Sequence, residues 1–163
     1  MKIRNSFISN SSSSSFIIIS SNGQEENDIR VDDGVFILGE YGECEFGWQE
    51  EKYNDMYSKI NFCYIQAKQI KNQDYLDLLE KVLKYKFPKI DIVFPIISDD
   101  WKCDETKVTH PVDYTDIRMR YGYVDHQSSS SEDQNLEMFE SEETLKNFLF
   151  NTSSYIQNDN DNH

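Results

Sequence analysis

The sequence predicts an α+β fold: a mixed or mostly antiparallel sheet of about five strands, two helices packed on one face, and a short C-terminal helix. Three observations lead to this prediction. The β-branched run at 17–19 and the apolar run at 90–97 are typical of buried strands. Between them, over 53–70 and 73–86, apolar residues recur at helical spacing. Two helices that lead into an apolar strand indicate a helical layer on one face of a sheet.

Length and composition favour one domain with an aromatic core. A chain of 163 residues fits a single domain, which we place at 1–163. Ten Phe, ten Tyr and two Trp are too many for a disordered chain, so aromatic side chains should fill the core. Within this domain, 1–15 is a serine-rich leader and 157–163 a polar tail.

The N-terminal part is predicted to be β-structure. The five serines at 11–15 lie between apolar Ile8 and Phe16, which leaves both an ordered strand edge or loop and a flexible tether open. A turn at 32–34 then leads into a second strand at 35–38.

A third strand is predicted at 41–48. Every second residue from Cys44 to Trp48 is apolar, which is the period of a half-buried strand. Residues 39–42 would then join it to the strand at 35–38 as a hairpin loop of about four residues.

Two helices are predicted in the middle of the chain. The first, at 53–70, has one apolar stripe, which consists of Met56, Ile60, Cys63, Ala67 and Ile70. Asn72 can cap the second helix, at 73–86, whose C-terminal lysines suit the helix dipole. Pro88 ends that helix, and the strand at 90–97 follows.

The last third of the chain is less regular. Residues 98–116 are polar and interrupted by Pro111, which indicates an excursion or an edge hairpin, and 118–124 is typical of another strand. Ser141 then caps a short helix with acidic residues in its first turn. The polar end, 155–163, is expected to fray.

Acidic residues exceed basic ones, most strongly near the C-terminus. The chain carries 30 Asp and Glu against 16 Lys and Arg, a net charge of −14. Residues 121–163 hold nine acids and one base (−8), which leaves −6 for residues 1–120. This field repels phosphate backbones and anionic lipids, so neither direct nucleic-acid binding nor membrane association is expected. It suits a basic groove on a protein partner, with simple solubility as the alternative explanation.

Cysteines and apolar runs indicate the cytoplasm of a host cell. Cys44, Cys63 and Cys103 are odd in number and form no CxxC pair, so neither a disulfide framework nor a thiolate zinc site is expected. No apolar run reaches the length of about 18 residues that a membrane helix needs. The run at 16–19 is too short and too interrupted by serine for a signal peptide.

Three segments are distinctive. They are the leader Arg4-Asn5-x-Phe7-x-Ser9-Asn10 with its five serines and Phe16, the segment Gly122-Tyr-Val-Asp-His-Gln-Ser128, and the ending Phe148-Leu-Phe-Asn151 with Ser154-Tyr155-Ile156 and Asn158-Asp159-Asn160. Together these segments, about a quarter of the chain, resemble a group of uncharacterised small proteins encoded by bacteriophages and bacteria. The resemblance implies a phage or mobile-element origin. The group has no established activity, so the resemblance implies no reaction and no catalytic residues.

Asp125, His126, Gln127 and Ser128 form the segment richest in chemically active groups. It follows the strand expected at 118–124, and functional residues often lie on loops that a rigid scaffold positions. A carboxylate beside an imidazole can orient a general base or share a metal, so Asp125 and His126 are candidate catalytic residues. Gln127 and Ser128 are candidate binding residues. A polar cluster that hydrogen-bonds neighbouring loops is the alternative.

The terminal acids offer a possible metal site. If the tail folds back, Asp159 and Asp161 could join Asp125 and His126 in a mixed oxygen–nitrogen site for a divalent metal. A solvated tail is the alternative, and in that case no cofactor is expected.

Glu43, Glu45 and Trp48 are further candidate binding residues. The two carboxylates share one face of the strand predicted at 41–48, and Trp48 lies on the other face. A solvated sheet face is the alternative for the carboxylates.

The acidity of 121–163 and the lack of a complete catalytic signature favour a non-enzymatic interaction protein of phage type, which modulates a host or phage protein. Two alternatives stay open. One is a metal-dependent hydrolase or related enzyme built on Asp125, His126 and the C-terminal acids. The other is a structural component of a virion. The sequence predicts a protein partner but neither its identity nor the oligomeric state.

Overall fold

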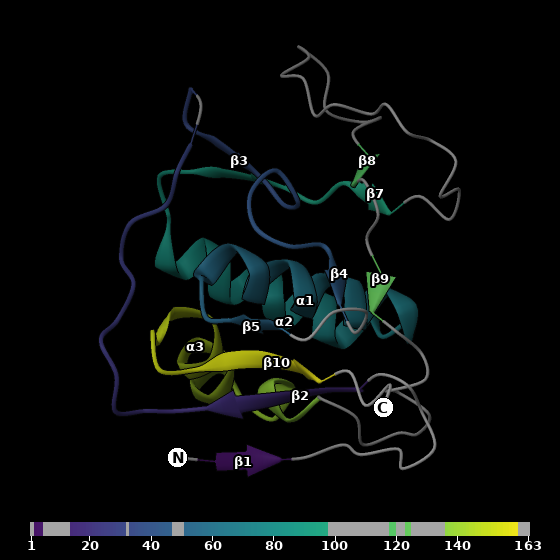
Figure 1. The fold of residues 1–163 in the computed structure, drawn as a ribbon. Helices are drawn as coiled ribbons and strands as arrows, with labels where there is room; N and C mark the ends of the chain where they lie inside the picture. Colours follow the sequence, from purple (N-terminus) through teal and green to yellow (C-terminus); the bar gives the residue numbers. More distant parts are fainter. Residues whose placement is uncertain are drawn as a thin grey trace.

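A four-stranded antiparallel sheet, a set of helices and short parallel ladders make up the described part of the chain (Figure 1). This computed structural model describes residues 2–4, 14–31, 33–46, 51–97, 118–119, 123–124 and 136–159. The fold class is α+β, as the sequence predicts. Strand number and pairing differ from the prediction in detail.

The four-stranded sheet has the order β1–β2–β10–β5, and all neighbouring strands are antiparallel. Its members are β1 (Lys2–Arg4), β2 (Ser14–Ile19), β10 (Tyr155–Asp159) and β5 (Glu51–Tyr53). Ile156 lies opposite Ile17 on one side and Tyr53 on the other. All three side chains are buried, so β10 links the hydrophobic faces of β2 and β5.

The segment 155–159 is a central strand, and the expectation that it frays is wrong. β10 pairs with β2 along its whole length and with β5 over residues 156–158. Ile156 and Asn158 form its buried side, at 0% and 1% exposure. A strand with one aliphatic residue carries a weak hydrophobic pattern, because most of its stability comes from backbone pairing on both edges. Residues 160–163 of the predicted tail lie outside the described ranges.

Local capping sets where the helices begin. The helices are α1 (Met56–Gln69), α2 (Gln73–Lys86), the 3₁₀ helix η2 (Glu137–Phe139) and α3 (Glu142–Phe150). Asn72 and Ser141 cap α2 and α3 as predicted: each accepts a hydrogen bond from a backbone N–H three residues later, at 3.1 Å. α1 begins later than predicted because Asp55 is its cap and accepts the Ser58 N–H at 2.9 Å.

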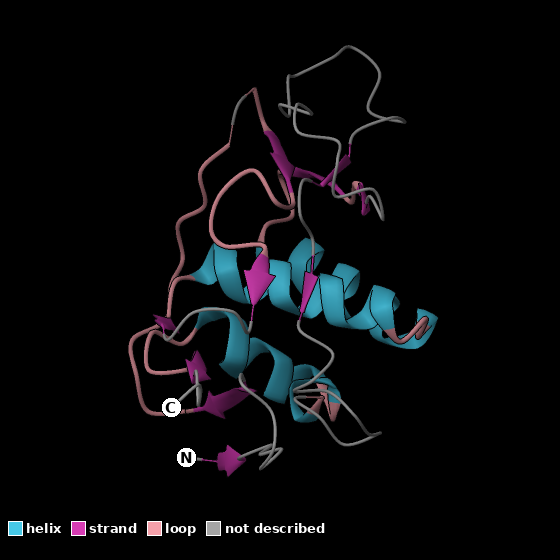
Figure 2. Cartoon of the chain, turned by 45° about the vertical axis from the view of Figure 1, so that its right-hand side comes forward, coloured by secondary structure: helices cyan, strands magenta, loops and turns pink. Residues whose placement is uncertain are grey.

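α1 and α2 lie between the four-stranded sheet and the ladder formed by β3 and β6 (Figures 1 and 2). α3 packs against β2 and contacts both other helices. The prediction that the first two helices alone cover the sheet is therefore incomplete, since α3 buries Leu145, Phe148 and Leu149 there.

α1 is buried around its whole circumference and not along one stripe. Every side chain from Ser58 to Ala67 is buried, which is typical of a helix at the centre of a domain. Polar side chains that a sequence pattern assigns to a solvent face therefore lie inside the protein. They are Ser58, Lys59, Asn61 and Gln66.

The remaining strands form parallel ladders, so the predicted hairpin around 39–42 is wrong. β3 (Val35–Ile37) pairs with β6 (Asp91–Val93), β4 (Glu45–Phe46) with β9 (Tyr123–Val124), and β7 (Ile96–Ile97) with β8 (Arg118–Met119). The strand predicted at 90–97 is divided into β6 and β7, with Pro95, which has no N–H to pair, between them. The strand predicted at 118–124 corresponds to β8 and β9, with 120–122 outside the described residues.

Candidate functional site

Most of the residues that the sequence singles out lie outside the described part of the chain. This holds for Asp125, His126, Gln127, Ser128, Trp48 and Asp161. Asp159 is described by its backbone, which pairs with Ser14 at the end of β10. The proposed meeting of Asp159 and Asp161 with Asp125 and His126 therefore stays a prediction.

The strands that lead into two of these segments are neighbours. β4 and β9 are parallel, with Phe46 opposite Val124, so their carboxyl ends lie at the same edge of the ladder. The segments that contain Trp48 and Asp125 follow these two ends in the chain. The backbone thus brings together strands that lie far apart in sequence.

Glu43 and Glu45 do not share a strand face as predicted, because β4 begins only at Glu45. Glu43 lies in the preceding loop, where its carboxylate accepts the N–H groups of Cys44 and Glu45, each at 3.0 Å. Burial, and then the nearby Glu43 carboxylate, raise the pKa of Glu45. Glu43 therefore stabilises its own loop, whereas the Glu45 side chain is exposed.

Two buried polar residues of α1 hold the loop at 39–44. The Asn61 amide donates to the carbonyls of Tyr41 at 2.8 Å and Glu43 at 3.1 Å, and its oxygen accepts the Gly39 N–H at 2.9 Å. The Ser58 hydroxyl accepts the Glu43 N–H at 2.8 Å. These bonds turn the loop onto α1, which explains why β3 and β4 do not form a hairpin.

Lys59 is the most unusual titratable residue of the described chain. Its side chain is 1% exposed, and its ammonium group donates to the carbonyls of Asn151 at 2.8 Å and Ser154 at 3.1 Å. Burial lowers its pKa to about 8, although the charges of Asp55, Glu26 and Cys63 oppose the shift. No sequence signal marked it, since lysine in an amphipathic helix is normally assigned to the solvent side.

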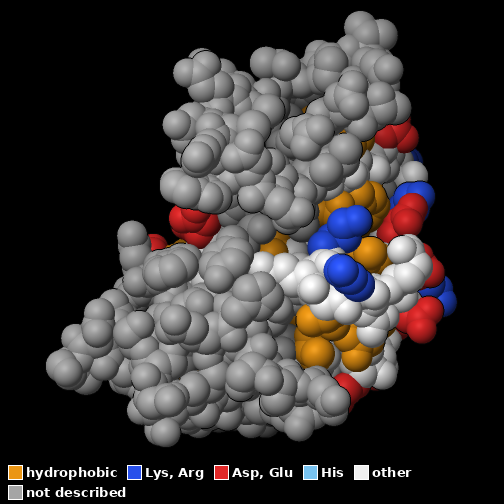
Figure 3. Space-filling model, turned by 90° about the vertical axis from the view of Figure 1, so that its right-hand side faces the viewer, with side chains coloured by type: hydrophobic (Ala, Val, Ile, Leu, Met, Phe, Trp, Pro, Cys, Tyr) orange, Lys and Arg blue, Asp and Glu red, His pale blue; other side chains and the backbone are white. Residues whose placement is uncertain are grey.

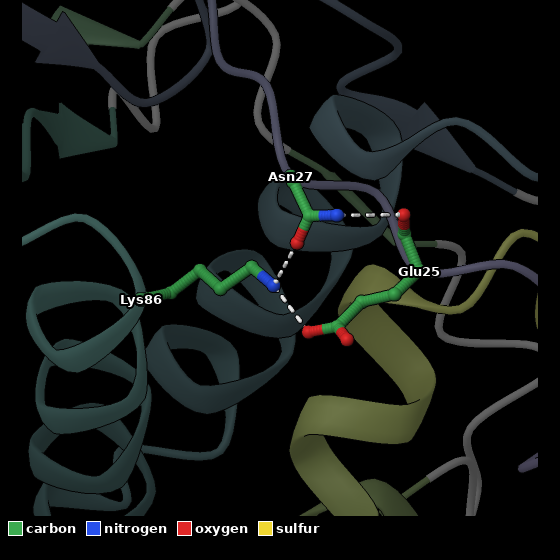
Figure 4. Close-up of polar contacts among 3 residues, drawn as sticks. All are labelled: Glu25, Asn27 and Lys86. Carbon is green, nitrogen blue, oxygen red and sulfur yellow. Dashed lines mark hydrogen bonds and ion pairs between the residues drawn. The ribbon is translucent and has the colours of Figure 1, made fainter.

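The loop after β2 is fastened to the ends of α2 and α3. Lys86 forms an ion pair with Glu25 and a hydrogen bond of 2.7 Å to the Asn27 side-chain oxygen (Figure 4). Its ammonium nitrogen lies 5.0 Å from the centre of the Phe150 ring. The Glu26 N–H also donates to the Phe150 carbonyl, so this loop is part of the packed structure.

The exposed sides of α2 and α3 meet along two side-chain contacts. Lys81 forms an ion pair with Glu142, and the Lys146 ammonium nitrogen lies 4.4 Å from the centre of the Tyr85 ring. The second contact is four residues further along both helices. Where they touch, the helices therefore run in the same direction, with their N-terminal ends together and their C-terminal ends together.

The charges on this α2/α3 face are segregated. Its acidic end, at the helix starts, consists of the exposed residues Asp74, Asp77, Glu140 and Glu143. Its basic end consists of Lys84 and Lys146 with Tyr85, whose side chain is 75% exposed. Lys84 also pairs with Glu80 at 2.6 Å. This order of charges complements the helix dipoles, and it gives one face two ends of opposite sign.

Elsewhere charges of opposite sign are interspersed. In the view of Figure 3, the described Lys and Arg side chains lie beside Asp and Glu side chains, with hydrophobic side chains between them. Interspersed charges are typical of a solvated surface and indicate no particular partner.

The two described thiols are poorly suited to nucleophilic chemistry. Burial raises the pKa of Cys44 to about 12, with the charges of Glu43 and Glu45 adding to the effect. Burial also raises the pKa of Cys63. Both therefore stay protonated near neutral pH. Among the described residues there is no group of three or more potential metal ligands, and no helix is long and apolar enough to cross a membrane.

Comparisons of the chain with protein-family models, with curated proteins and with solved structures gave no match. The surfaces and buried groups described above are therefore the basis for a functional proposal.

Proposed function

We propose that this protein is a non-enzymatic interaction protein that binds a basic surface of a host or phage protein. The observation that carries the proposal is the acidic end of the α2/α3 face, where Asp74, Asp77, Glu140 and Glu143 are exposed together. The phage-type origin and the cytoplasmic location rest on the sequence alone.

Charge is the physical basis of the interaction. The chain carries a net charge of −14, so a basic partner is attracted from a distance, and the acidic end offers it a local contact. Binding of this kind depends mainly on exposed charges, so salt should weaken it strongly.

Several described groups that could serve an enzyme already have structural roles. The Lys59 ammonium is held by two carbonyls, and the Glu43 carboxylate accepts two N–H groups of its own loop. The Cys63 thiol is fully buried with a raised pKa. These contacts favour a binding role for the described surface.

The test is capture of partners from a bacterial lysate on the immobilised protein, at low and high salt. We expect a partner that binds at low salt, is released at high salt, and is lost when Asp74→Asn, Asp77→Asn and Glu143→Gln are combined. The matched control combines Asp28→Asn, Asp33→Asn and Asp91→Asn, which removes the same charge from exposed acids outside α2 and α3.

Capture that is equal for both triple variants would overturn the role of the acidic end. The metal-dependent alternative makes a different prediction. If Mn²⁺, Mg²⁺, Ca²⁺ or Zn²⁺ raises the melting temperature and an Asp125→Asn/His126→Ala variant abolishes this shift, the enzyme hypothesis would replace the proposal.

A further inference from the structure

We propose that the α2/α3 face is also a self-association surface, on which a second copy of this chain docks antiparallel. The acidic end of each copy then lies against the basic end of the other. The proposal does not depend on the proposed function, because it concerns the purified protein alone.

The argument starts from the direction of the two helices. The pairs Lys81–Glu142 and Tyr85–Lys146 show that α2 and α3 run the same way across this face. The acidic side chains of both helix starts are therefore pooled at one end, and the basic side chains of both helix ends at the other. A twofold axis near Lys81 exchanges the two ends, which makes the face complementary to itself.

The spacing along α2 fits such an axis. Asp77 lies four residues before Lys81, and Tyr85 lies four residues after it. An axis at Lys81 thus brings Asp77 of one copy opposite Tyr85 of the second copy, where the tyrosine hydroxyl can donate to the carboxylate. Lys84 lies beside the same carboxylate in this arrangement. Tyr85 gains a role that its 75% exposure otherwise leaves unexplained.

The ends are far enough apart to act separately. Asp74 and Lys84 are ten residues apart, or about 15 Å along the helix, which exceeds the screening length of about 8 Å at physiological salt. The same screening weakens the general repulsion between two chains of net charge −14, while charges in direct contact still attract.

The association should be weak. α2 has 14 residues, about 21 Å, and two packed helices give a face about 20 Å wide. This corresponds to about 400 Å² per copy, roughly half of a standard interface. We therefore expect a dimer that forms at high protein concentration and dissociates on dilution.

The test is a charge exchange measured by sedimentation velocity at about 150 mM salt. One variant reverses the basic end (Lys84→Glu/Lys146→Glu), and the other reverses one acid on each helix (Asp77→Lys/Glu143→Lys). Each variant alone should be monomeric at concentrations where the wild type dimerises, because like charges then face each other. An equimolar mixture of the two should dimerise again.

Net charge makes this experiment decisive. The variants carry −14 − 4 = −18 and −14 + 4 = −10, so the mixed dimer has the same total charge as the wild-type dimer. If net repulsion controlled association, the −10 variant would dimerise better than the wild type, whereas docking on this face predicts that it dimerises less.

A control variant changes the same charge elsewhere, with Lys52→Glu on β5 and Lys68→Glu on α1, and should dimerise like the wild type. Circular dichroism confirms that all variants are folded. A wild type that stays monomeric at every concentration, a mixture that fails to dimerise, or a control that loses the dimer would each overturn the proposal.

Discussion

Lys59 in α1 donates a hydrogen bond of 2.8 Å to the backbone carbonyl of Asn151, which follows the last residue of α3. The same ammonium group reaches the Ser154 carbonyl, just before β10 begins. One buried side chain thus joins the central helix to the turn that positions the central strand. This turn is also held by Ser154, whose hydroxyl accepts the Ser20 N–H at 2.8 Å and donates to the Asn147 carbonyl at 2.7 Å.

Removal of the Lys59 side chain should destabilise the protein strongly. Lys59→Ala leaves the Asn151 and Ser154 carbonyls without their buried donor, and we expect a loss of about 3 kcal/mol in the free energy of unfolding. Lys68→Ala, at an exposed position on the same helix, should change it by less than about 0.5 kcal/mol. Urea unfolding measures both. Equal stability of the two variants would mean that the bonds of Lys59 contribute nothing net.

The unfolding free energy should depend on pH through Lys59. Its pKa is about 8 in the folded protein and near the ordinary value of 10.5 in the unfolded chain. Between these two values the unfolded chain binds more protons, so the free energy of unfolding should rise with pH, by about 3 kcal/mol in total.

The comparison with a Lys59→Met variant isolates this effect. Burial raises the pKa of the Cys63 thiol and of the Tyr64 hydroxyl, which lowers stability as pH rises in both proteins. The difference in unfolding free energy, wild type minus variant, should increase from pH 8 to 10.5. A difference that is constant or falls across this window contradicts the lowered pKa.

Two glycines with similar backbone angles should respond differently to alanine. Gly42 has φ +80°, and an added Cβ would lie 2.6 Å from the Ser58 backbone nitrogen. Gly34 has φ +76° with nothing within 4 Å of an added Cβ. We expect Gly34→Ala to cost about 1 kcal/mol for the backbone angle, and Gly42→Ala about 3 kcal/mol, because α1 must also move. Thermal melting of the pair measures the difference, and similar melting temperatures would contradict the close packing of this loop on α1.

The position of β10 predicts which terminal residues matter. Ile156 is 0% exposed, so Ile156→Ala should cost about 3 kcal/mol. Gln157, the next residue, points to the other side of the strand, and Gln157→Ala should cost less than about 1 kcal/mol. Urea unfolding separates the two. If the segment frayed, neither substitution would matter.

The predicted site is tested least by the structure, for a reason that lies in its composition. Asp125, His126, Gln127 and Ser128 stand out by their chemistry, but no hydrophobic pattern in the sequence anchors them to a neighbouring element. Glu43 illustrates the same problem in a described loop. Its carboxylate binds two adjacent N–H groups, which depends on loop conformation and not on residue spacing.

The sequence by itself determined the α+β class, the buried run at 17–19, the bounds of α2, and the caps Asn72 and Ser141. These features are local, because apolar spacing and a capping side chain act within a few residues. Only the tertiary structure decided the non-local features, whose partners lie far apart in the chain. They are the central place of β10, the parallel pairing of β3 with β6, and the burial of Lys59 and Asn61. Burial of a polar side chain is favourable only where distant backbone groups supply its hydrogen bonds, and Asn151 lies 92 residues from Lys59.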